Sequence, residues 1–311
     1  MKKMLIVTDG KAGHENQSKA FCGALGYGFD LLHVSYQSGA KKALAYLSDR
    51  LGLLTTPFES DPLPDSDYAA VVATGSTAFY PGKVMARRLK VPAVAILYPK
   101  GYRLDFDCIL APVFDNPVDR PNIIPIPVNL TSADKAFYER GVQAFHERYK
   151  PQGKGVGVII GGPNGFAEMS VGRMKNDLEA LFARTEGMER WVTTSRRTPP
   201  EVEALVDSLP FDYKLLYSKD HFNPIPAFVS LCDRLFVTAD STGMISEAVT
   251  RGNAKVEVLM NLRDDNSKFA RFVHNLERLH AVHCFDGTLG VASEKVDLVP
   301  IFAKARELIG L

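Results

Sequence analysis

The residue types best suited to chemistry stand together in residues 234–248, where the pattern predicts a buried strand, a polar turn and a helix. The turn holds Asp240, Ser241, Thr242 and Gly243. Ser241 is the predicted N-cap, and Gly243 lets a ligand approach the backbone closely. The first helical turn, residues 242–244, carries no acid. Its N–H groups and the positive end of the helix dipole therefore suit an anion, which makes this turn a predicted binding site.

One acid lies within reach of this turn. Glu247 follows Gly243 by one helical turn on the same face, so its carboxylate can reach the rim of the anion site. The alternative is an ordinary capped helix on which Glu247 is solvated.

A second turn in this half of the chain is rich in glycine. It follows an apolar strand predicted over 156–160 and includes Gly161, Gly162 and Asn164. Three glycines within 161–165 indicate a close approach of the backbone to another group, since a plain tight turn needs only one.

A third turn carries adjacent cations. Ser195, Arg196 and Arg197 follow a strand predicted over 191–194. The forked guanidinium groups could clamp a phosphate, and solvation at the surface is the alternative. Because all three turns follow strands, we expect them at the carboxyl edge of one parallel sheet, where open α/β sheets hold ligands.

The first half of the chain has a turn of its own with reactive side chains. Asp9, Lys11, Gly13 and His14 follow a strand predicted over 4–8. Two glycines and a lysine in such a turn resemble phosphate-binding loops, so Lys11 and Gly13 are candidate substrate-binding residues. Their spacing matches neither the dinucleotide fingerprint nor the P-loop. His14 is a candidate general base because an imidazole titrates near neutral pH, and a surface histidine at a helix start is the alternative.

A similar turn follows the strand predicted over 68–73. It consists of Thr74, Gly75 and Ser76, and a helix begins directly after it. We therefore expect a second group of backbone N–H donors at the same edge of the first sheet.

Strands and helices alternate along both halves of the chain, which predicts two parallel sheets with right-handed crossovers. The polar and Pro/Gly-rich run 150–155 is the predicted linker. The fold class is therefore α/β, with two Rossmann-like, doubly wound domains at 1–150 and 151–311 that face a cleft. The last helix, 296–308, could pack back on the first domain. The cleft is the default ligand site, with the second domain as the nucleotide side and the first as the acceptor side.

Composition favours a soluble globular protein over a nucleic-acid-binding or disulfide-rich one. The 311 residues are 46% hydrophobic and 23% charged, with a net charge of +1, so no global field steers the chain to nucleic acid. The four cysteines are scattered singly, which predicts neither a zinc site nor a disulfide framework. We expect a reducing, cytoplasmic location and no metal.

The pattern contains no signal peptide and no apolar run of the roughly 18 residues that a spanning helix needs. Peripheral contact with the membrane remains an alternative, because the helix predicted over 77–89 carries cations along its length and directly after its end. These are Lys83, Arg87, Arg88 and Lys90. A solvated basic face is the alternative interpretation.

Several of these motifs together resemble one family along nearly the whole chain. The matching pieces are 9–17, Gly161-Gly162-Pro163-Asn164, 195–199, Asn223-Pro224, 238–241 and Ser246-Glu247-Ala248. They resemble the "elongated mitochondria" fission proteins of plants and their bacterial relatives, which are named as glycosyltransferases. The run 240–252 is also similar to the donor-binding segment of nucleotide-sugar transferases of the GT-B fold, such as the peptidoglycan transferase of the lipid II step.

The resemblance implies a glycosyltransferase that uses a nucleotide-diphosphate sugar and needs no other cofactor. It implies that Glu247, with Ser246, accepts hydrogen bonds from a sugar or ribose hydroxyl and that Asn223 lies near the nucleobase. Gly161, Gly162 and Asn164 would line the site beside the leaving group, while the 241–243 amides with Arg196 and Arg197 would hold its phosphates. His14 would be the base, with Asp9 as the fallback. The acceptor, in such bacterial enzymes commonly a cell-envelope saccharide or lipid, and the oligomeric state are not readable from the sequence.

Three alternatives remain at this point. Asp105 and Asp107 fit the Asp-x-Asp pattern of metal-dependent transferases, although they lie in the first domain just before a strand. A nucleotide-sugar 2-epimerase would share the architecture but needs acids that flank the sugar. A non-catalytic adaptor that keeps the fold and binds a partner is the third.

Overall fold

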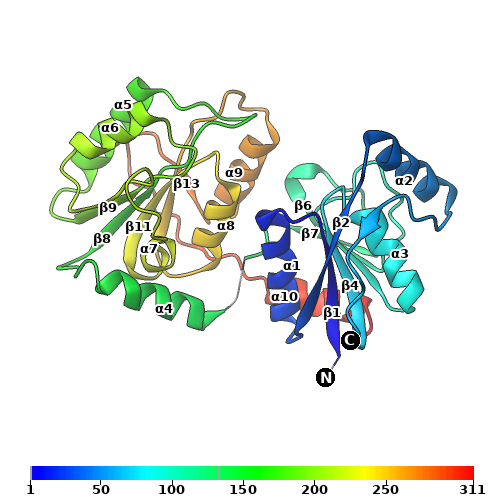
Figure 1. Ribbon diagram of the computed structural model, residues 1–311. Coiled ribbons are helices and arrows are strands. Elements are labelled where there is room, and N and C mark those ends of the chain that lie inside the picture. Colours follow the sequence, from blue (N-terminus) through cyan, green and yellow to red (C-terminus); the bar gives the residue numbers. More distant parts are fainter. Residues whose placement is uncertain (1, 132–133) are drawn as a thin grey trace. The chain divides into compact units, whose positions relative to one another are not determined.

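The computed structural model describes residues 2–131 and 134–311, which form two compact units (Figure 1). Unit 1 comprises Met1–Ala133 and Asp297–Leu311, and unit 2 comprises Asp134–Val296. Each unit contains one mainly parallel sheet with helices on both faces. The predicted α/β class with two doubly wound sheets is confirmed.

Unit 1 contains a seven-stranded sheet in the order β3-β2-β1-β4-β5-β6-β7, in which only the short β3 runs antiparallel. Its strands are β1 (Lys3–Thr8), β2 (Phe29–Ser35), β3 (Glu59–Ser60), β4 (Tyr68–Thr74), β5 (Ala93–Ile96), β6 (Cys108–Pro112) and β7 (Ile123–Ile126). Its helices are α1 (Ala12–Ala24), α2 (Gly39–Leu51), α3 (Phe79–Leu89) and α10 (Val299–Leu308), with a short 3-10 turn at Val113–Asp115. The chain reverses direction across the sheet after β2, so β1 and β4 lie side by side at the switch point.

Helices cover both faces of this sheet. On one face α1 meets α10, where the rings of Phe21 and Phe302 lie 6.3 Å apart and Arg306 donates a hydrogen bond to the Leu25 carbonyl. On the other face α2 and α3 pack against β1 and β4 through a buried core that includes Ala45 and Tyr80. The C-terminal helix therefore belongs to unit 1.

Unit 2 contains a six-stranded, fully parallel sheet in the order β10-β9-β8-β11-β12-β13. Its strands are β8 (Gly155–Ile159), β9 (Glu189–Thr193), β10 (Tyr213–Leu215), β11 (Cys232–Thr238), β12 (Lys255–Leu259) and β13 (His283–Cys284). Its helices are α4 (Lys135–His146), α5 (Val171–Arg184), α6 (Pro200–Ser208), α7 (Ile225–Leu231), α8 (Thr242–Thr250) and α9 (Lys268–Arg278). The switch point lies between β8 and β11, which places the turns after these two strands next to each other.

The chain passes between the units before α4 rather than at the run 150–155. Phe145 of α4 is fully buried, with its ring centroid 5.2 Å from that of Trp191 and 4.9 Å from that of Tyr213. Gly141 packs so closely on Pro226 of α7 that an added Cβ would lie 2.5 Å from the Pro226 ring. This aromatic packing attaches α4 to the unit 2 sheet, so the polar run 150–155 is a loop within unit 2.

Two helix starts differ from the sequence prediction. Helix α1 begins at Ala12, so Gly13 and His14 lie in its first turn and not in the preceding loop. Thr198 followed by two prolines predicts a helix that starts at Thr198 with Pro199 at its first position. Helix α6 instead begins at Pro200 with Pro199 as N-cap, and the Thr198 hydroxyl donates to the Ile160 and Gly161 carbonyls. Of the helices in the described ranges, none combines the length and the apolar character that crossing a membrane requires.

Candidate functional site

The three predicted turns of unit 2 meet at the side chain of Asp240. This side chain is fully buried, and its carboxylate accepts hydrogen bonds from the Gly162 N–H at 3.0 Å and from Arg197 Nη2 at 2.7 Å. Asn261, which follows β12, donates to the same carboxylate at 3.3 Å and accepts from the Asp240 N–H at 3.2 Å. One carboxylate therefore joins the turns after β8, β9 and β11, as expected for the carboxyl edge of neighbouring parallel strands.

Other groups lie very close to the backbone at these glycines, as predicted. These groups belong to the protein itself. A Cβ added at Gly161 would lie 2.2 Å from Asp240 Oδ2, and one added at Gly162 would lie 2.1 Å from the Arg197 carbonyl oxygen. Asn164 donates to the Asp240 carbonyl at 3.1 Å and accepts from two backbone N–H groups of its own turn. These residues build the frame of the site, and a direct contact with substrate stays a prediction.

The two adjacent arginines have different surroundings. Arg197 is engaged by Asp240 and by the carbonyls of Gly162 and Pro163 at 2.8 and 3.4 Å, so its fork holds the frame together. Arg196 is exposed and, within residues 2–131 and 134–311, has no hydrogen-bond or ion-pair partner. The predicted phosphate clamp is therefore reduced to one free cation. The Ser195 hydroxyl accepts from the Arg197 N–H at 3.2 Å.

A cavity of 450 Å³ adjoins this turn. Its lining includes Ser195 and Arg196, and Tyr217 and Lys219 from the segment after β10. The acids Glu203 and Asp207 also line it, and Asp207 pairs with Lys219 at 2.7 Å. The Tyr217 ring is stacked on His221 with centroids 4.4 Å apart. The cavity thus combines a free guanidinium with an aromatic side chain, a pairing that suits a phosphorylated ring compound. Tyr217 carries no sequence signal that would have singled it out.

Helix α8 begins at Thr242 with Ser241 in the N-cap position, as predicted. The Ser241 side chain makes no capping hydrogen bond, and the first turn, including Gly243, contains no acid. Since the Asp240 carboxylate is directed to Gly162 and Arg197, it does not occupy the end of the helix. The positive end of the α8 dipole is therefore left uncompensated by these side chains.

Two residues further along α8 are less accessible than the sequence predicted. Ser246 is fully buried and donates to the Thr242 carbonyl at 2.7 Å, so its hydroxyl serves the helix. Glu247 is half-buried rather than solvated, and it accepts a hydrogen bond of 2.8 Å from the Tyr138 hydroxyl of α4. Burial raises the pKa of Glu247, against the opposing effects of the Tyr138 hydrogen bond and the Arg251 charge. Tyr138 was not identified from the sequence because its helix was assigned to the first domain.

Asn223 lies before α7 on the surface of unit 2. Its side-chain oxygen accepts a hydrogen bond of 3.2 Å from the N–H of Ile225, the first residue of α7, for which Pro224 is the N-cap. The predicted role beside a nucleobase stays a prediction.

In unit 1 the predicted base and its fallback form a pair. His14 Nδ1 lies 2.9 Å from Asp9 Oδ1, and the exposed Lys11 ammonium lies 2.7 Å from Asp9 Oδ2. Burial acts to raise the pKa of Asp9, but hydrogen bonds from Lys11 and His14 outweigh it, so the pKa is below its ordinary value. A carboxylate can only accept, so Nδ1 carries the proton of this bond, and the neutral imidazole keeps a lone pair on Nε2.

The turn after β4 supports this histidine. Gly75 has a φ of +88°, and an added Cβ would lie 2.3 Å from His14 Cε1, so the ring rests directly on the glycine. Thr74 is buried and shares a 2.7 Å hydrogen bond with Ser18. The Ser76 hydroxyl accepts from Lys42 at 3.1 Å. The turn therefore positions His14, and substrate binding by its side chains stays a prediction.

The Asp-x-Asp pair of unit 1 is occupied by protein groups. Asp105 binds the Lys83 ammonium at 2.5 Å, and Asp107 accepts from the Ala93 N–H at 2.7 Å. Lys83 is itself buried and also binds Asp49 at 2.7 Å, so it does not belong to a solvated basic face. These carboxylates maintain the structure of unit 1 and are not placed as a free metal-binding pair.

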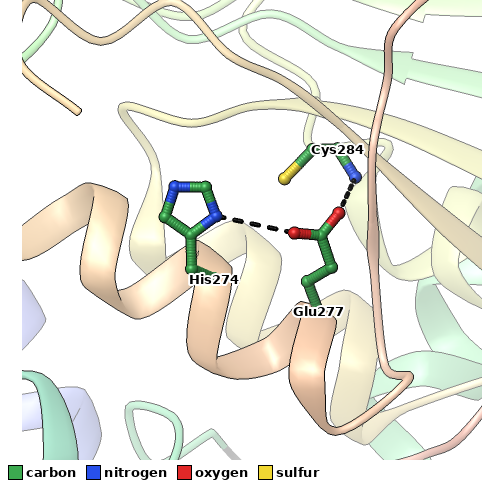
Figure 2. Close-up of side chains that lie close together, drawn as sticks. All are labelled: His274, Glu277 and Cys284. Atoms are coloured by element: carbon green, nitrogen blue, oxygen red, sulfur yellow. Dashed lines mark hydrogen bonds and ion pairs between the residues drawn. The ribbon is translucent and has the colours of Figure 1, made fainter.

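One group of side chains in the described part of the chain brings three potential metal ligands together (Figure 2). His274 and Glu277 of α9 and Cys284 of β13 have ligand atoms within 4.8 Å of one another. Glu277 is already bound, by His274 Nδ1 at 3.5 Å and by the Cys284 N–H at 3.1 Å. Burial and the Glu277 carboxylate raise the pKa of the Cys284 thiol to about 12. Because Glu277 is already bound by protein groups, the arrangement forms a hydrogen-bonded cluster in this structure.

Solved structures with a similar fold include the UDP-GlcNAc 2-epimerase from Neisseria meningitidis bound to UDP-GlcNAc, at 12% identity and a TM-score of 0.50 over 99% of this chain and 92% of that chain. The UDP-GlcNAc 2-epimerase from Methanocaldococcus jannaschii has 12% identity and a TM-score of 0.50 over 89% of this chain and 92% of that chain. This likeness shows the fold, which is the GT-B fold with two Rossmann-like domains that the sequence predicted.

A comparison with curated proteins finds no match. The family described as "Mitochondrial fission ELM1" matches residues 12–307, which is nearly the whole chain. The chain therefore belongs to the mitochondrial fission ELM1 family, as its motifs predicted.

Proposed function

We propose that this protein is a metal-independent glycosyltransferase that moves a sugar from a nucleotide-diphosphate sugar to a hydroxyl group of an acceptor. The observation that carries the proposal is the convergence on Asp240. Its buried carboxylate aligns the turns after β8 and β9 with the start of α8, whose first turn has no acid. Backbone N–H groups held rigidly at a helix start are suited to a diphosphate.

In this proposal the diphosphate binds at the backbone amides of the first turn of α8, with the free guanidinium of Arg196 as the accompanying cation. The Ser241 amide, which was predicted to take part, donates to the Thr238 carbonyl at 3.2 Å and is left out. As the bond between the sugar C1 and the diphosphate oxygen breaks, the oxygen keeps the electron pair. Preorganised donors would then stabilise the developing charge, typically by about 10²–10³ in rate for one donor. The nucleoside would occupy the neighbouring cavity lined by Tyr217. The epimerase of Neisseria meningitidis was solved with UDP-GlcNAc, which makes uridine diphosphate sugars the first donors to test.

The acceptor would be activated in unit 1. The acceptor hydroxyl gives its proton to His14 Nε2 while its oxygen forms the new bond to the sugar C1. The charge that develops on the imidazole is compensated by Asp9, whose lowered pKa keeps it ionised. General bases of this kind contribute about 10²–10⁴ in rate.

The proposal is tested with the full chain. Thermal unfolding is measured with uridine, guanosine and adenosine diphosphates and with UDP-GlcNAc. A ligand present at about 100 times its Kd adds about 2.7 kcal/mol to the free energy of unfolding, which is readily visible. Arg196→Ala should remove most of the shift, while Arg173→Ala, an exposed arginine on α5, should leave it unchanged. If none of these compounds stabilises the protein, the donor site is absent and a non-catalytic adaptor role is favoured.

A second candidate, a nucleotide-sugar 2-epimerase, is favoured by one observation. Glu247 is a half-buried acid whose pKa is raised, with a tyrosine hydroxyl at 2.8 Å, and such a pair can transfer protons. Incubation with UDP-GlcNAc and no acceptor distinguishes the two reactions. An epimerase produces the C2 isomer, whereas a transferase produces only unchanged donor or its slow hydrolysis products.

A further inference from the structure

Large apolar side chains are exposed in one short segment of unit 1. Leu44, Leu47, Leu51, Leu53 and Leu54 are between 45% and 63% exposed, and we call them the leucine face. They account for five of the thirteen large exposed hydrophobic residues in the described ranges. The others are spread over the rest of the chain, so this concentration needs an explanation that the core of unit 1 does not supply.

The exposure follows from the way α2 packs. The helix turns Ala45, Ser48 and Asp49 toward the protein, where all three are buried. Leu44, Leu47 and Leu51 recur at helical spacing and share a neighbouring face that is exposed. A helix of an ordinary globular surface would place its leucines inward and its polar residues outward. Figure 1 shows α2 on the same side of the unit 1 sheet as α3, the helix it packs against.

Cations adjoin the leucine face. A cavity of 290 Å³ is lined by Leu53 and Leu54 and by Arg87, Lys90 and Arg103. Arg87 and Lys90 are exposed, and no carboxylate among the described residues pairs with either of them.

The acids that line the same cavity are already engaged. Asp49 and Asp105 bind Lys83, Asp105 also reaches Arg103 at 3.2 Å, and Asp107 accepts from a backbone N–H. Lys41 and Arg50 add exposed positive charge on α2 itself. The surroundings of the leucine face are therefore positively charged.

We propose that the leucine face docks on the surface of an anionic phospholipid bilayer, with a headgroup phosphate held in the 290 Å³ cavity by Arg87 and Lys90. Leucine side chains on one helix face enter the boundary between headgroups and acyl chains, and flanking cations bind the headgroup phosphates. A second copy of the chain fits less well, because a symmetric contact through this face would bring the same cations together. The surface lies within unit 1 and does not depend on the proposed reaction.

The test is co-sedimentation of the full chain with phosphatidylcholine vesicles, with and without phosphatidylglycerol. Binding should require the anionic lipid and weaken as salt is added. Leu47→Gln/Leu51→Gln should lower the partition coefficient at least about tenfold. Arg87→Gln/Lys90→Gln should lower it by about 25-fold, from roughly a fivefold effect for each cation.

Matched controls exist in unit 2. Leu279→Gln changes a leucine that is 50% exposed, and Lys150→Gln/Lys154→Gln removes two exposed cations. Both controls should bind vesicles like the wild type, and all variants should keep the melting temperature because the changed side chains are exposed. The proposal would be overturned if Leu47→Gln/Leu51→Gln and Arg87→Gln/Lys90→Gln both bound vesicles as well as the wild type. A lipid-free dimer in sedimentation equilibrium that Leu47→Gln/Leu51→Gln converts to monomer would also overturn it, since that result assigns the face to a second copy.

Discussion

The Arg197 guanidinium lies 2.7 Å from the fully buried Asp240 carboxylate, and this pair ties the turn after β9 to the turn after β11. Both residues were predicted to bind substrate, yet they bind each other. The pair leaves Arg196 as the cation that can move toward a ligand, while the backbone around it is held in place. A site whose donors are fixed before the ligand arrives loses less entropy on binding.

Arg197→Ala should destabilise the protein, whereas Arg196→Ala should not. Loss of Arg197 leaves a buried carboxylate without its charged partner. Because Arg197 is 39% exposed, we expect the free energy of unfolding to fall by roughly 1–3 kcal/mol, less than for loss of one partner of a fully buried pair. Arg196→Ala should change the free energy of unfolding by under about 0.5 kcal/mol but reduce turnover at least about tenfold. Urea unfolding and transfer assays on both variants measure this, and equal stability of the two would contradict the assignment.

Gly162→Ala should disrupt the frame of the site. Its Cβ would lie 2.1 Å from the Arg197 carbonyl oxygen, a backbone atom that cannot turn aside. We expect the free energy of unfolding to fall by about 1–3 kcal/mol, as it does when a core is overpacked. Diphosphate binding should be lost as well. Gly165→Ala in the same turn is the control, because its Cβ would meet nothing within 4 Å. Urea unfolding and diphosphate titration of the two variants give the comparison, and a fully stable Gly162→Ala protein would show that the turn is looser than described.

Gly75→Ala should reduce transfer by displacing His14. The added Cβ would lie 2.3 Å from the imidazole, and a φ of +88° is strained for alanine. The effect on the rate should approach that of His14→Gln, about 10²–10⁴. Gly23→Ala on the same helix, whose Cβ meets nothing within 4 Å, should keep its activity and stabilise α1 slightly. Steady-state transfer rates at saturating donor measure these effects. Full activity of His14→Gln would show that His14 is not the general base.

Glu247 should make stability depend on pH. Its pKa is raised in the folded state above the ordinary value of 4.5, so the folded protein binds the proton more tightly than the unfolded chain does. Stability should therefore be greatest below pH 4.5 for this group and fall as the pH rises from there through the raised pKa. Glu247→Gln should abolish that decline. The control Glu179→Gln changes a glutamate that is 59% exposed and should leave the decline in place. Melting temperatures measured across this pH window test the sign.

The order of strands and helices was predictable because each element has its own local pattern. The strands at 68–73 and 235–237 are runs of buried apolar residues, and the convergence of three turns follows from parallel strands alone. The absence of an acid in the first turn of α8 was likewise readable, since it concerns residue types at known positions.

The partners of the polar side chains could not be predicted in the same way. Residue types indicate what Arg197, Lys83 or Glu247 can bind, whereas the structure shows which groups lie nearest, namely Asp240, Asp49 with Asp105, and Tyr138. The three glycines were interpreted as space for a ligand, although two of them make room for Asp240 and for the Arg197 backbone. Helix α4 was assigned to the first domain because its aromatic residues gave no indication of their partners in β9 and β10.

The chain passes between the two units twice, before α4 and again before α10. Unit 2 is thus a single uninterrupted segment that could be produced alone, whereas unit 1 is encoded in two pieces. A protein cut before Asp297 would lose Phe302 and Arg306 from the α1 face, so the first sheet depends on residues that follow unit 2 in the chain. During synthesis unit 2 is therefore complete, and can fold, before α10 of unit 1 has been made.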